Sequence, residues 1–457
     1  MPPPSRLPPF IGRERESAFL EELAASGKAE LFVLYGRRRV GKTELLQRFC
    51  QGRRAVYFFA TQVRAKDNLR ALGTAIAEGL DDPLAAELSF PDLAAALSYL
   101  AERAASERLV VVLDEFPYLC EGGQGVPSQV QRFWDTRGKT SRMLLVLCDS
   151  QVSFMEKEVL AEPSPLFGRR TAQRRLEPIR PLETLAFFPE WELRERVLGY
   201  AILGGMPAYL QRFDSRKSLR ENLLAEVLRP EGYLFDEVNF LLRSELTNPA
   251  TYASILAACA RGAARLNDIA LEAGIDSTTA GKYLHILREL RLVEREIPIT
   301  DPNPLRSRRG TYRVVDRFVQ FHFKHVQPNL SLIHAGRGGR VLEQYVEPDL
   351  ERLFDEARVD FVLDHLRSEA AELVGEELVE VGRHDGRFVR ALARTASGGA
   401  VAAIVVPEGQ RSTAPLETEQ KHLEALFGTP LVKLVYGVTA RPDRPLEVER
   451  VPAGELL

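Results

Sequence analysis

The sequence predicts an α/β fold that begins with a parallel sheet and continues through a helical region into a second, smaller α/β domain. Three apolar runs, residues 31–35, 109–115 and 143–150, are short and rich in Leu and Val, as buried parallel strands are. The residues from Lys42 onward, KTELLQRFC, have the periodicity of a helix. With 457 residues, 45% of them hydrophobic and 27% charged, the chain is long enough for about two to four domains.

A glycine-rich segment joins the first strand to the first helix. Residues 36–43 fit the pattern GxxxxGK(S/T), whose glycines let successive backbone N–H groups point at phosphate oxygens. The Lys42 ammonium adds positive charge near the outer phosphates, and the Thr43 hydroxyl is a ligand for Mg²⁺. The three arginines in the segment are either solvated, or they face the nucleotide or DNA. The segment predicts bound ATP or ADP with Mg²⁺, contacted by Gly36, Arg37, Arg38, Arg39, Val40, Gly41, Lys42, Thr43 and Glu44.

Two further strands end in polar groups at the edge where a parallel sheet presents its ligands. The run LVVVLDE ends with Asp114, which is expected to hold Mg²⁺ through water, and Glu115, which is expected to orient or deprotonate the attacking water. The run MLLVLCDS ends with Asp149 and Ser150. Ser150 is the first candidate for a group that senses the γ-phosphate and Asp149 the second, while the alternative is that both only cap their strand.

Six motifs follow one another in an order that resembles the archaeal-type ATPase family. That family also occurs in bacteria and belongs to the STAND group of P-loop ATPases, which is related to the AAA+ class. The resemblance covers most of the chain, and the order of the motifs is more specific than any one of them. The motifs are FIGRERE (10–16), YGRRRVGKTEL (35–45), VVVLDEFPYL (110–119), LVLCDSQVSFM (145–155), SPLFGRRTAQRRLEPI (164–179) and GGMPAYL (204–210).

The resemblance implies further site residues. It places Ile11, Gly12 and Arg13 beside the adenine and ribose, and it places Gly205 and Pro207 of a helical lid near the base. Arg169 and Arg170 are similar in placement to arginines that contact the γ-phosphate, either within one chain or from a neighbouring one. The other reading of these two arginines is a solvated basic turn. The expected catalytic residues are Lys42, Glu115, Ser150, Arg169 and Arg170.

The segment from residue 250 to 315 has the pattern of a winged helix. Three helical stretches, ATYASILAACARG, LNDIALEAG and STTAGKYLHILRELRLV, precede two extended ones. Such a fold offers one helix to the major groove and a basic wing to the phosphates of double-stranded DNA. The alternative is a protein-contact or lid module. The residues expected at the DNA are Thr278, Thr279, Lys282, Arg306, Arg308 and Arg309.

The end of the chain looks like the nuclease-like domain of the same family, with its metal site lost. Arg390 lies near the position of an expected acidic ligand, and the run AVAAIV at 400–405 has Ala and Ile in place of the expected Glu and Lys. From Val341 to the C-terminus there are 13 Lys+Arg and 22 Asp+Glu, a net charge of −9, which leaves +6 for the rest of a chain whose total is −3. Because negative charge repels both DNA and a substrate phosphate, nuclease activity is not expected. A degenerate α/β domain for protein contact or oligomerisation is expected instead.

Together these patterns predict a P-loop ATPase core (1–182), a helical lid (183–245), a winged helix (246–330) and a degenerate nuclease-like domain (331–457). The predicted function is a Mg²⁺-dependent ATP-hydrolysing switch that contacts DNA. The alternative is a nucleotide-gated scaffold or regulator that hydrolyses ATP slowly or not at all, with an acidic C-terminal surface for a protein partner. A nucleotide-dependent homo-oligomer fits either one.

No run approaches the roughly 20 apolar residues that span a bilayer, and the opening MPPPSRLPPF has no signal core. A cytoplasmic protein without membrane contact is therefore expected.

Overall fold

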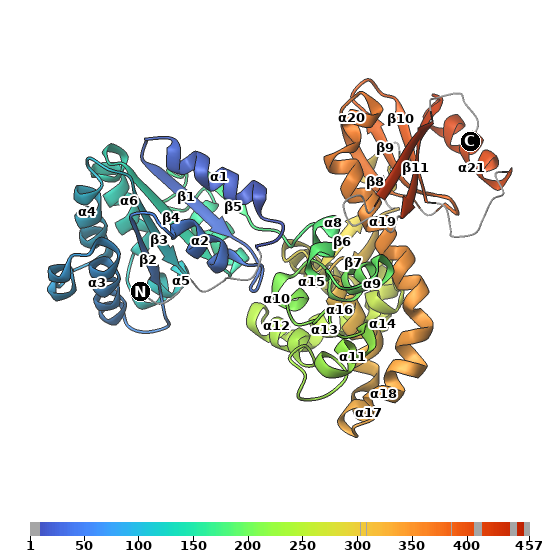
Figure 1. Cartoon of the computed structure of the whole chain (residues 1–457), viewed down its shortest axis with the longest axis horizontal. Helices are drawn as coiled ribbons and strands as arrows, with labels where there is room; N and C mark the ends of the chain where they lie inside the picture. The colour runs from blue at the N-terminus through green and yellow to red at the C-terminus, as the bar shows by residue number, and fades with distance from the viewer. Residues whose placement is uncertain are drawn as a thin grey trace. The chain divides into compact units, whose positions relative to one another are not determined.

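The computed structural model describes residues 10–301, 303–307, 309–384, 386–405, 414–438 and 446–451. The chain divides into two compact units, Met1–Ile179 and Arg180–Leu457 (Figure 1). Each unit has its own elements and core, so the two are treated separately below.

The first unit is built on a sheet of five parallel strands in the order β2-β3-β4-β1-β5. The three runs that the sequence marks as strands are β1, β3 and β4, and every residue in them is buried. This confirms the predicted parallel sheet. Because β4 lies between β1 and β3, the carboxyl ends of these three strands meet at one edge. The strands are β1 (Glu30–Tyr35), β2 (Ala55–Phe59), β3 (Leu109–Asp114), β4 (Met143–Asp149) and β5 (Ala172–Arg175).

Helices cover both faces of this sheet. Figure 1 shows α3 (Ala65–Leu80), α4 (Leu93–Arg103) and α6 (Val126–Thr136) on one side. Their apolar residues form one core with the alternate strand residues that point toward them. On the other side lie α1 (Glu14–Ala25) and α2 (Lys42–Cys50), where the Phe19 ring meets the Phe32 ring edge to face at 5.7 Å. Two short helices, α5 (Phe116–Gly122) and α7 (Val152–Phe154), follow β3 and β4. The sheet is therefore buried on both faces, and only its edges are open to a ligand.

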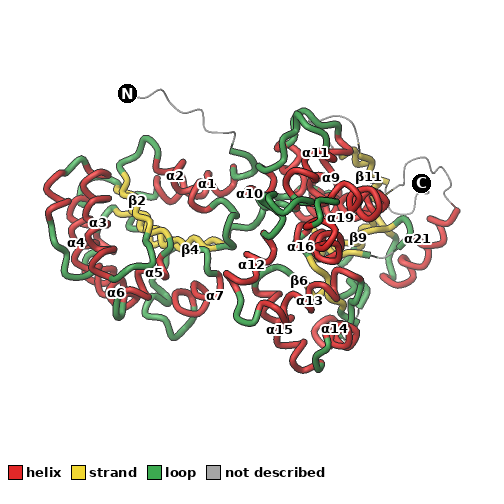
Figure 2. Tube along the Cα trace, turned by 90° about the horizontal axis from the view of Figure 1, so that it is seen from below, coloured by secondary structure: helices red, strands yellow, loops and turns green. Residues whose placement is uncertain are grey.

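The second unit opens with helices that are interrupted at Pro and Gly, as the sequence predicts for residues 183–245. The long helix α19 packs against α9, where the Tyr200 and Phe361 rings lie 5.2 Å apart. Figure 2 shows α9, α16 and α19 side by side in this unit. The helices are α8 (Pro181–Thr184), α9 (Leu193–Leu203), α10 (Pro207–Leu210), α11 (Leu219–Glu226), α12 (Glu237–Glu245), α16 (Arg317–Phe321), α17 (Leu330–His334), α18 (Gly338–Val341) and α19 (Leu350–Ser368).

Three helices and a two-stranded antiparallel sheet lie between α12 and α16. The third helix begins after Asp276, whose carboxylate accepts a hydrogen bond from the Thr279 N–H at 2.9 Å. Leu284, Leu287 and Leu290 of that helix point into the core. Three helices are thus followed by two antiparallel strands, and the assignment of this segment as a winged helix stays a prediction. The elements are α13 (Pro249–Arg261), α14 (Leu266–Ala273), α15 (Ser277–Glu289), β6 (Val293–Glu296) and β7 (Thr311–Val314).

The chain ends in a second sheet, in the order β12-β11-β10-β9-β8, in which only β10 and β11 run parallel. Helices α19 and α20 (Ala370–Val374) pack on one face, and α21 (Ala414–Phe427) packs on the other through Leu423. The strands are β8 (Leu378–Arg383), β9 (Val389–Thr395), β10 (Ala400–Val405), β11 (Leu431–Val438) and β12 (Leu446–Val451).

The loop between β6 and β7 contributes to the core of this C-terminal sheet. Ile299 from the loop is only 3% exposed and packs in a cluster with Phe388, Leu392 and Leu423. The Arg394 Nη2 group donates a hydrogen bond to the Ile299 carbonyl at 3.2 Å. The hairpin and the C-terminal sheet therefore share one hydrophobic core, although nearly ninety residues separate Ile299 from Phe388.

Candidate nucleotide-binding site

The loop between β1 and α2 needs glycine at both of its fixed glycine positions. A Cβ atom at Gly36 would lie 2.5 Å from the Leu176 carbonyl oxygen. This distance is too short for any side chain, so only glycine fits at this position. Gly41 has a φ of 97°, in the left-handed region that L residues avoid. The chain can therefore turn from the strand into the helix with its backbone N–H groups on the inner side of the loop only because these two residues lack side chains.

Lys42 begins α2 and its ammonium lies in the centre of the loop. Its Nζ atom donates hydrogen bonds to the carbonyl oxygens of Gly36 at 2.7 Å and Arg37 at 3.1 Å. The side chain is buried, so the charge is fixed in position before any ligand arrives. An ammonium has three donors, and the loop uses two of them. This arrangement places one positive charge where the outer phosphates of a nucleotide bind in such loops.

The side-chain oxygens of Thr43 and Asp114 lie next to each other at the end of β3. The Thr43 hydroxyl donates to Asp114 Oδ2 at 2.9 Å, and the Glu115 N–H donates to Asp114 Oδ1 at 3.0 Å. Hydroxyl and carboxylate oxygens are the ligands that Mg²⁺ prefers, and Mg²⁺ usually takes its remaining ligands from water and phosphate. The described residues hold no group of three or more His, Cys, Asp or Glu side chains that suits a metal. The Thr43–Asp114 pair therefore fits a Mg²⁺ ion that arrives with a nucleotide.

Glu115 and Ser150, which the sequence predicts as base and γ-phosphate sensor, lie together. The Ser150 hydroxyl is 3.1 Å from both carboxylate oxygens of Glu115. Glu115 has a φ of 54°, a left-handed conformation that is costly for a residue with a side chain. Such backbone strain is concentrated at functional sites. The Ser150 hydroxyl therefore contacts the carboxylate of Glu115, and its role toward the γ-phosphate stays a prediction.

Asp149 is fully buried beneath this pair. Its Oδ1 atom accepts a hydrogen bond from the Ser150 N–H at 2.6 Å, and no described residue bonds its Oδ2 atom. Burial, with a smaller contribution from the negative charge of Glu115, raises the pKa of the Asp149 carboxyl to about 8. In the nucleotide-free protein Asp149 is therefore largely neutral at pH 7.

The raised pKa of Asp149 gives a prediction about stability and pH. A carboxyl with a folded pKa of about 8 and an unfolded pKa of about 3.9 holds a proton in the folded state that the unfolded state has lost. Over the interval between these values, folding stability falls as pH rises, by up to about 1.4 kcal/mol per pH unit. Asp149→Asn cannot ionise, so its free energy of unfolding relative to wild type should increase from pH 5 to pH 8. Urea titrations of the nucleotide-free proteins would measure this.

The matched control for this titration is Glu78→Gln, which neutralises an exposed carboxyl on α3. Its stability relative to wild type should vary little over the same pH range. If Asp149→Asn and wild type lose stability in parallel from pH 5 to pH 8, Asp149 is ionised in the folded protein and the assignment is wrong.

The arginines near the loop have different environments. The Arg13 Nη2 group donates to the Val40 carbonyl at 2.7 Å, so the FIGRE segment is attached to the phosphate loop. Its role beside the adenine stays a prediction. Arg37 is buried, while Arg38 and Arg39 are half-buried. The reading in which all three loop arginines are solvated is therefore wrong. A role toward the nucleotide or toward DNA stays a prediction for each.

Arg169 and Arg170 are distinguished by their contacts. Two nitrogens of Arg169 pair with Asp135 Oδ2, Nε at 2.9 Å and Nη2 at 2.8 Å. The Arg170 guanidinium lies over the Phe167 ring at 5.8 Å, and no ion pair engages it within the described part of the chain. Arg169 is thus held by a carboxylate, whereas Arg170 is available to a ligand.

A cavity of about 330 Å³ adjoins Glu115 in the first unit. Its size is within the range of small-molecule pockets. Arg38, from the phosphate loop, lines the same cavity, so this space connects the predicted base with the loop. The other lining residues are Phe59, Ala60, Thr61, Gln62 and Tyr118.

Sequence reasoning missed Tyr57, whose hydroxyl donates a hydrogen bond to Asp114. Burial raises the pKa of the Tyr57 hydroxyl well above its ordinary value, and the neighbouring Asp114 carboxylate adds to this effect, so the group remains a donor. The segment AVYFF reads only as an apolar strand. The Tyr57 hydroxyl is the one polar group in this strand that could have indicated a site residue. That it reaches Asp114 could be known only once β2 was seen to lie beside β3.

The remaining predicted site residues lie in the second unit. Pro207 begins α10 and Gly205 precedes it by two positions, and their approach to a nucleotide stays a prediction. Thr278, Lys282, Arg306 and Arg309 are exposed. The hydroxyl of Thr279, by contrast, donates to the Asp276 carboxylate at 2.6 Å as part of the helix cap. Arg308 lies outside the described residues.

Within the described ranges, no helix combines the length and apolarity that crossing a membrane requires.

Comparison with known proteins identifies the family. The family described as an ATPase domain predominantly from Archaea matches residues 10–213, and a domain of unknown function matches residues 194–315. An uncharacterized protein of Methanocaldococcus jannaschii is 32% identical over 329 residues, which are 72% of this chain and 71% of that protein. The chain belongs to the archaeal-type P-loop ATPase family. This confirms the resemblance seen in the sequence motifs, and membership of this family implies that the protein binds a nucleotide.

Two further relatives of this ATPase agree. An uncharacterized ATP-binding protein of Methanocaldococcus jannaschii is 47% identical over 45 residues, 10% of this chain and 76% of its own length. Among solved structures, the Walker-type ATPase of Pyrococcus abyssi matches with a TM-score of 0.50 at 21% identity, over 69% of this chain and 96% of that one. At this identity the likeness shows a shared fold. The fold of the protein is therefore supported by a solved structure as well as by the family match.

Proposed function

We propose that the protein is a Mg²⁺-dependent ATP-hydrolysing switch. Two hydrogen-bonded pairs at one sheet edge, Thr43 with Asp114 and Ser150 with Glu115, support this most strongly. Hydrolysis of the γ-phosphate needs a held metal and an oriented water. The first pair would hold Mg²⁺, which supplies positive charge to the phosphates. The second pair would orient the attacking water, with Glu115 accepting its proton.

The other residues of the site stabilise the charge that develops on the transferred phosphate. Lys42 contributes a fixed ammonium from within the loop. Arg170 is the better of the two predicted arginines because Asp135 holds Arg169. Arg170 would act within its own chain or on the nucleotide of a neighbouring copy in a homo-oligomer. Residues 183–245 would serve as a lid that couples the nucleotide to the rest of the second unit.

We further propose that the segment α13–β7 is a winged helix that contacts double-stranded DNA. The exposed side chains of Thr278 and Lys282 on α15 would face the major groove. Arg306 and Arg309, exposed in the β6–β7 loop, would face phosphates together with Arg308. The hydroxyl of Thr279 is used by the helix cap, so its role in reading bases is the weakest of the set.

The alternative is a nucleotide-gated scaffold that binds a protein partner, with slow or no hydrolysis and without DNA. The buried position of Ile299 favours it, because the hairpin already makes an apolar protein contact with the C-terminal sheet. The net charge of −9 from Val341 onward also suits a basic partner better than DNA. In either case residues 331–457 would be a degenerate nuclease-like domain used for contact. Arg390 stands in β9, and every residue of β10 is buried, which leaves no acidic pair at the predicted ligand positions.

DNA binding is tested by the salt dependence of affinity for a fluorescent duplex. Each phosphate contact contributes about 0.9 to the slope of log affinity against log salt. The double variant Arg306→Ala/Arg309→Ala should therefore bind more weakly and reduce this slope by about two. Phosphate release from ATP, measured in parallel, should rise with DNA in the wild type and not in the variant.

The matched control is Arg216→Ala/Arg229→Ala, which removes two exposed arginines that lie outside the hairpin. It should bind DNA as the wild type does. Equal loss in both double variants would mean that binding is only non-specific attraction to positive charge. A wild type that ignores DNA but changes its oligomeric size with ATP would support the scaffold instead.

A further inference from the structure

The carboxylate of Asp114 has more hydrogen-bond donors than a metal site requires. Its Oδ1 atom accepts from the Glu115 N–H, and its Oδ2 atom accepts from the Thr43 hydroxyl. A second hydroxyl, that of Tyr57, donates to the same Oδ2 atom. Thr43 and Glu115 have roles of their own at the nucleotide. Tyr57 has no other role in the mechanism, so its contact with Asp114 needs an explanation.

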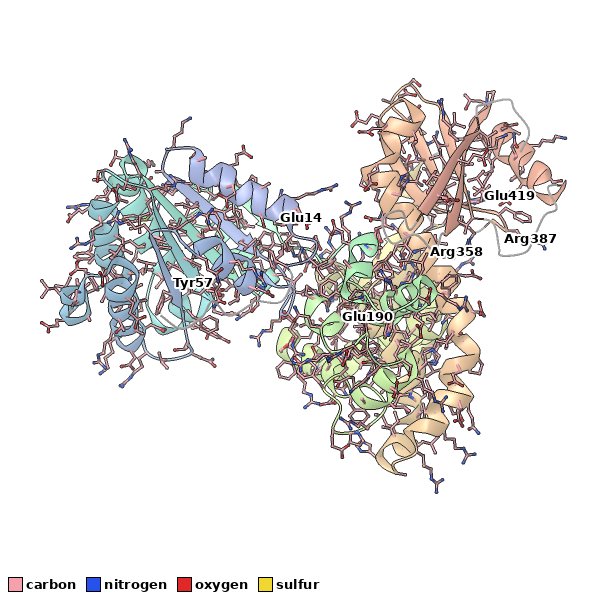
Figure 3. All side chains as sticks on the ribbon, viewed as in Figure 1. Glu14, Tyr57, Glu190, Arg358, Arg387 and Glu419 are labelled. Carbon is pink, nitrogen blue, oxygen red and sulfur yellow. The ribbon has the colours of Figure 1, made fainter. Side chains whose placement is uncertain are left out.

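The register of the sheet brings Tyr57 to this position. In the parallel pair β2–β3, Tyr57 aligns with Val112 and Phe59 aligns with Asp114. Since side chains alternate between the faces of a strand, Tyr57 lies on the same face as Asp114 and one pair away from it along the strands. An aromatic side chain spans such a diagonal. Val56 and Phe58 point to the opposite face, into the core, and hold the strand in this register. Figure 3 labels Tyr57 beside the strands of the first unit.

The hydroxyl of Tyr57 fixes the orientation of a carboxylate that would otherwise rotate. The bond from the Thr43 hydroxyl would not constrain Asp114 in the same way, because the Thr43 oxygen is itself a proposed ligand of the metal. Tyr57 is different, because its oxygen lies at the end of a rigid ring on a sheet strand. It can therefore hold Oδ2 in one place whether or not a metal is bound.

We propose that Tyr57 is a positioning residue for the Mg²⁺ site: by holding Asp114 Oδ2 it keeps the carboxylate aimed at the water shell of the ion. The inference rests on the proposed Mg²⁺-dependent function. The proposed role of Tyr57 is exerted through the carboxylate of Asp114, to which its hydroxyl donates. It is the counterpart, on the neighbouring strand, of the partners that orient ligands at other metal sites.

The test is the affinity of the full-length protein for metal in the presence of an ATP analogue that is not hydrolysed. Mn²⁺ would replace Mg²⁺ as the probe, because its binding is read directly by electron paramagnetic resonance. Tyr57→Phe keeps the ring and removes only the donor. It should weaken Mn²⁺ binding about tenfold, within the 10- to 100-fold range for loss of such a partner. Affinity for the analogue in excess chelator should stay within about twofold. The Mg²⁺ concentration that gives half-maximal turnover should rise by the same factor as the Mn²⁺ dissociation constant.

Two further variants make the outcomes distinct. Tyr99 donates to the Asp82 carboxylate at 2.7 Å, so Tyr99→Phe removes the same kind of bond away from the site and should leave Mn²⁺ affinity unchanged. Asp114→Asn removes the proposed ligand itself and should abolish most of the Mn²⁺ binding.

If Asp114→Asn loses the metal and Tyr57→Phe keeps it, the role of Tyr57 is refuted while the proposed function stands. If Asp114→Asn binds Mn²⁺ normally, the metal site itself is misplaced. If Tyr99→Phe weakens Mn²⁺ binding as much as Tyr57→Phe does, the effect is a general loss of stability, and the proposal fails.

Discussion

Lys42→Ala should lower the affinity for ATP by about 100-fold, consistent with the loss of hydrogen bonds and charge at a phosphate, each worth about 1.5–3 kcal/mol. The variant loses the ammonium that the loop holds through the carbonyl oxygens of Gly36 and Arg37. Equilibrium binding of a fluorescent ATP analogue to the full chain would measure the change. Turnover at saturating ATP would fall as well, since the same charge stabilises the transferred phosphate.

The control for charge is Lys28→Ala, which removes an exposed lysine that precedes β1. Its affinity for the analogue should equal that of wild type. Circular dichroism would establish that Lys42→Ala is folded, because the variant leaves two loop carbonyls without their donor. Wild-type affinity in a folded Lys42→Ala protein would mean that the nucleotide does not bind in this loop, and the proposed function would be wrong.

Glu115→Gln should reduce the rate of ATP hydrolysis by 10²- to 10⁴-fold, the usual contribution of a general base. The amide oxygen can still accept the hydrogen bond from Ser150, so the geometry of the pair is kept while the proton acceptor is lost. Binding of ATP should change by no more than about threefold, because Glu115 does not face the phosphates as a charge partner. Single-turnover phosphate release separates the two effects.

The neighbouring acid of α5 gives a matched control. Glu121→Gln makes the same chemical change at an exposed carboxylate two turns along the chain, and its turnover should equal that of wild type. If Glu115→Gln hydrolyses ATP at the wild-type rate, the base is another group, and the contact between Ser150 and Glu115 is only structural.

Much of the first unit was predictable because its signals are local. The strand, the loop and the helix around Lys42 are contiguous in sequence, and the predicted elements appear as β1 and α2. The pairing of Ser150 with Glu115 was less accessible. Both residues were candidates, but their contact depends on β4 lying next to β3.

The features that the sequence did not reveal are those made by distant contacts. Tyr57 contacts Asp114 across 57 positions, and only the strand order makes them neighbours. The difference between Arg169 and Arg170, which lie in the turn before β5, depends on Asp135 of α6. Ile299 stands in the stretch IPITDPNP, whose Pro, Asp and Asn residues are typical of an exposed loop. Two isoleucines among them are too few to form a periodic pattern.

The shared core around Ile299 has a consequence for how such proteins diversify. The hairpin and the C-terminal sheet are not interchangeable parts, because a side chain from the first completes the packing of the second. A chimera that takes its C-terminal domain from a relative must also take the β6–β7 loop, or it will leave a cavity beside Phe388 and Leu423. Substitutions in the two segments should therefore be inherited together, and recombination between them should be selected against.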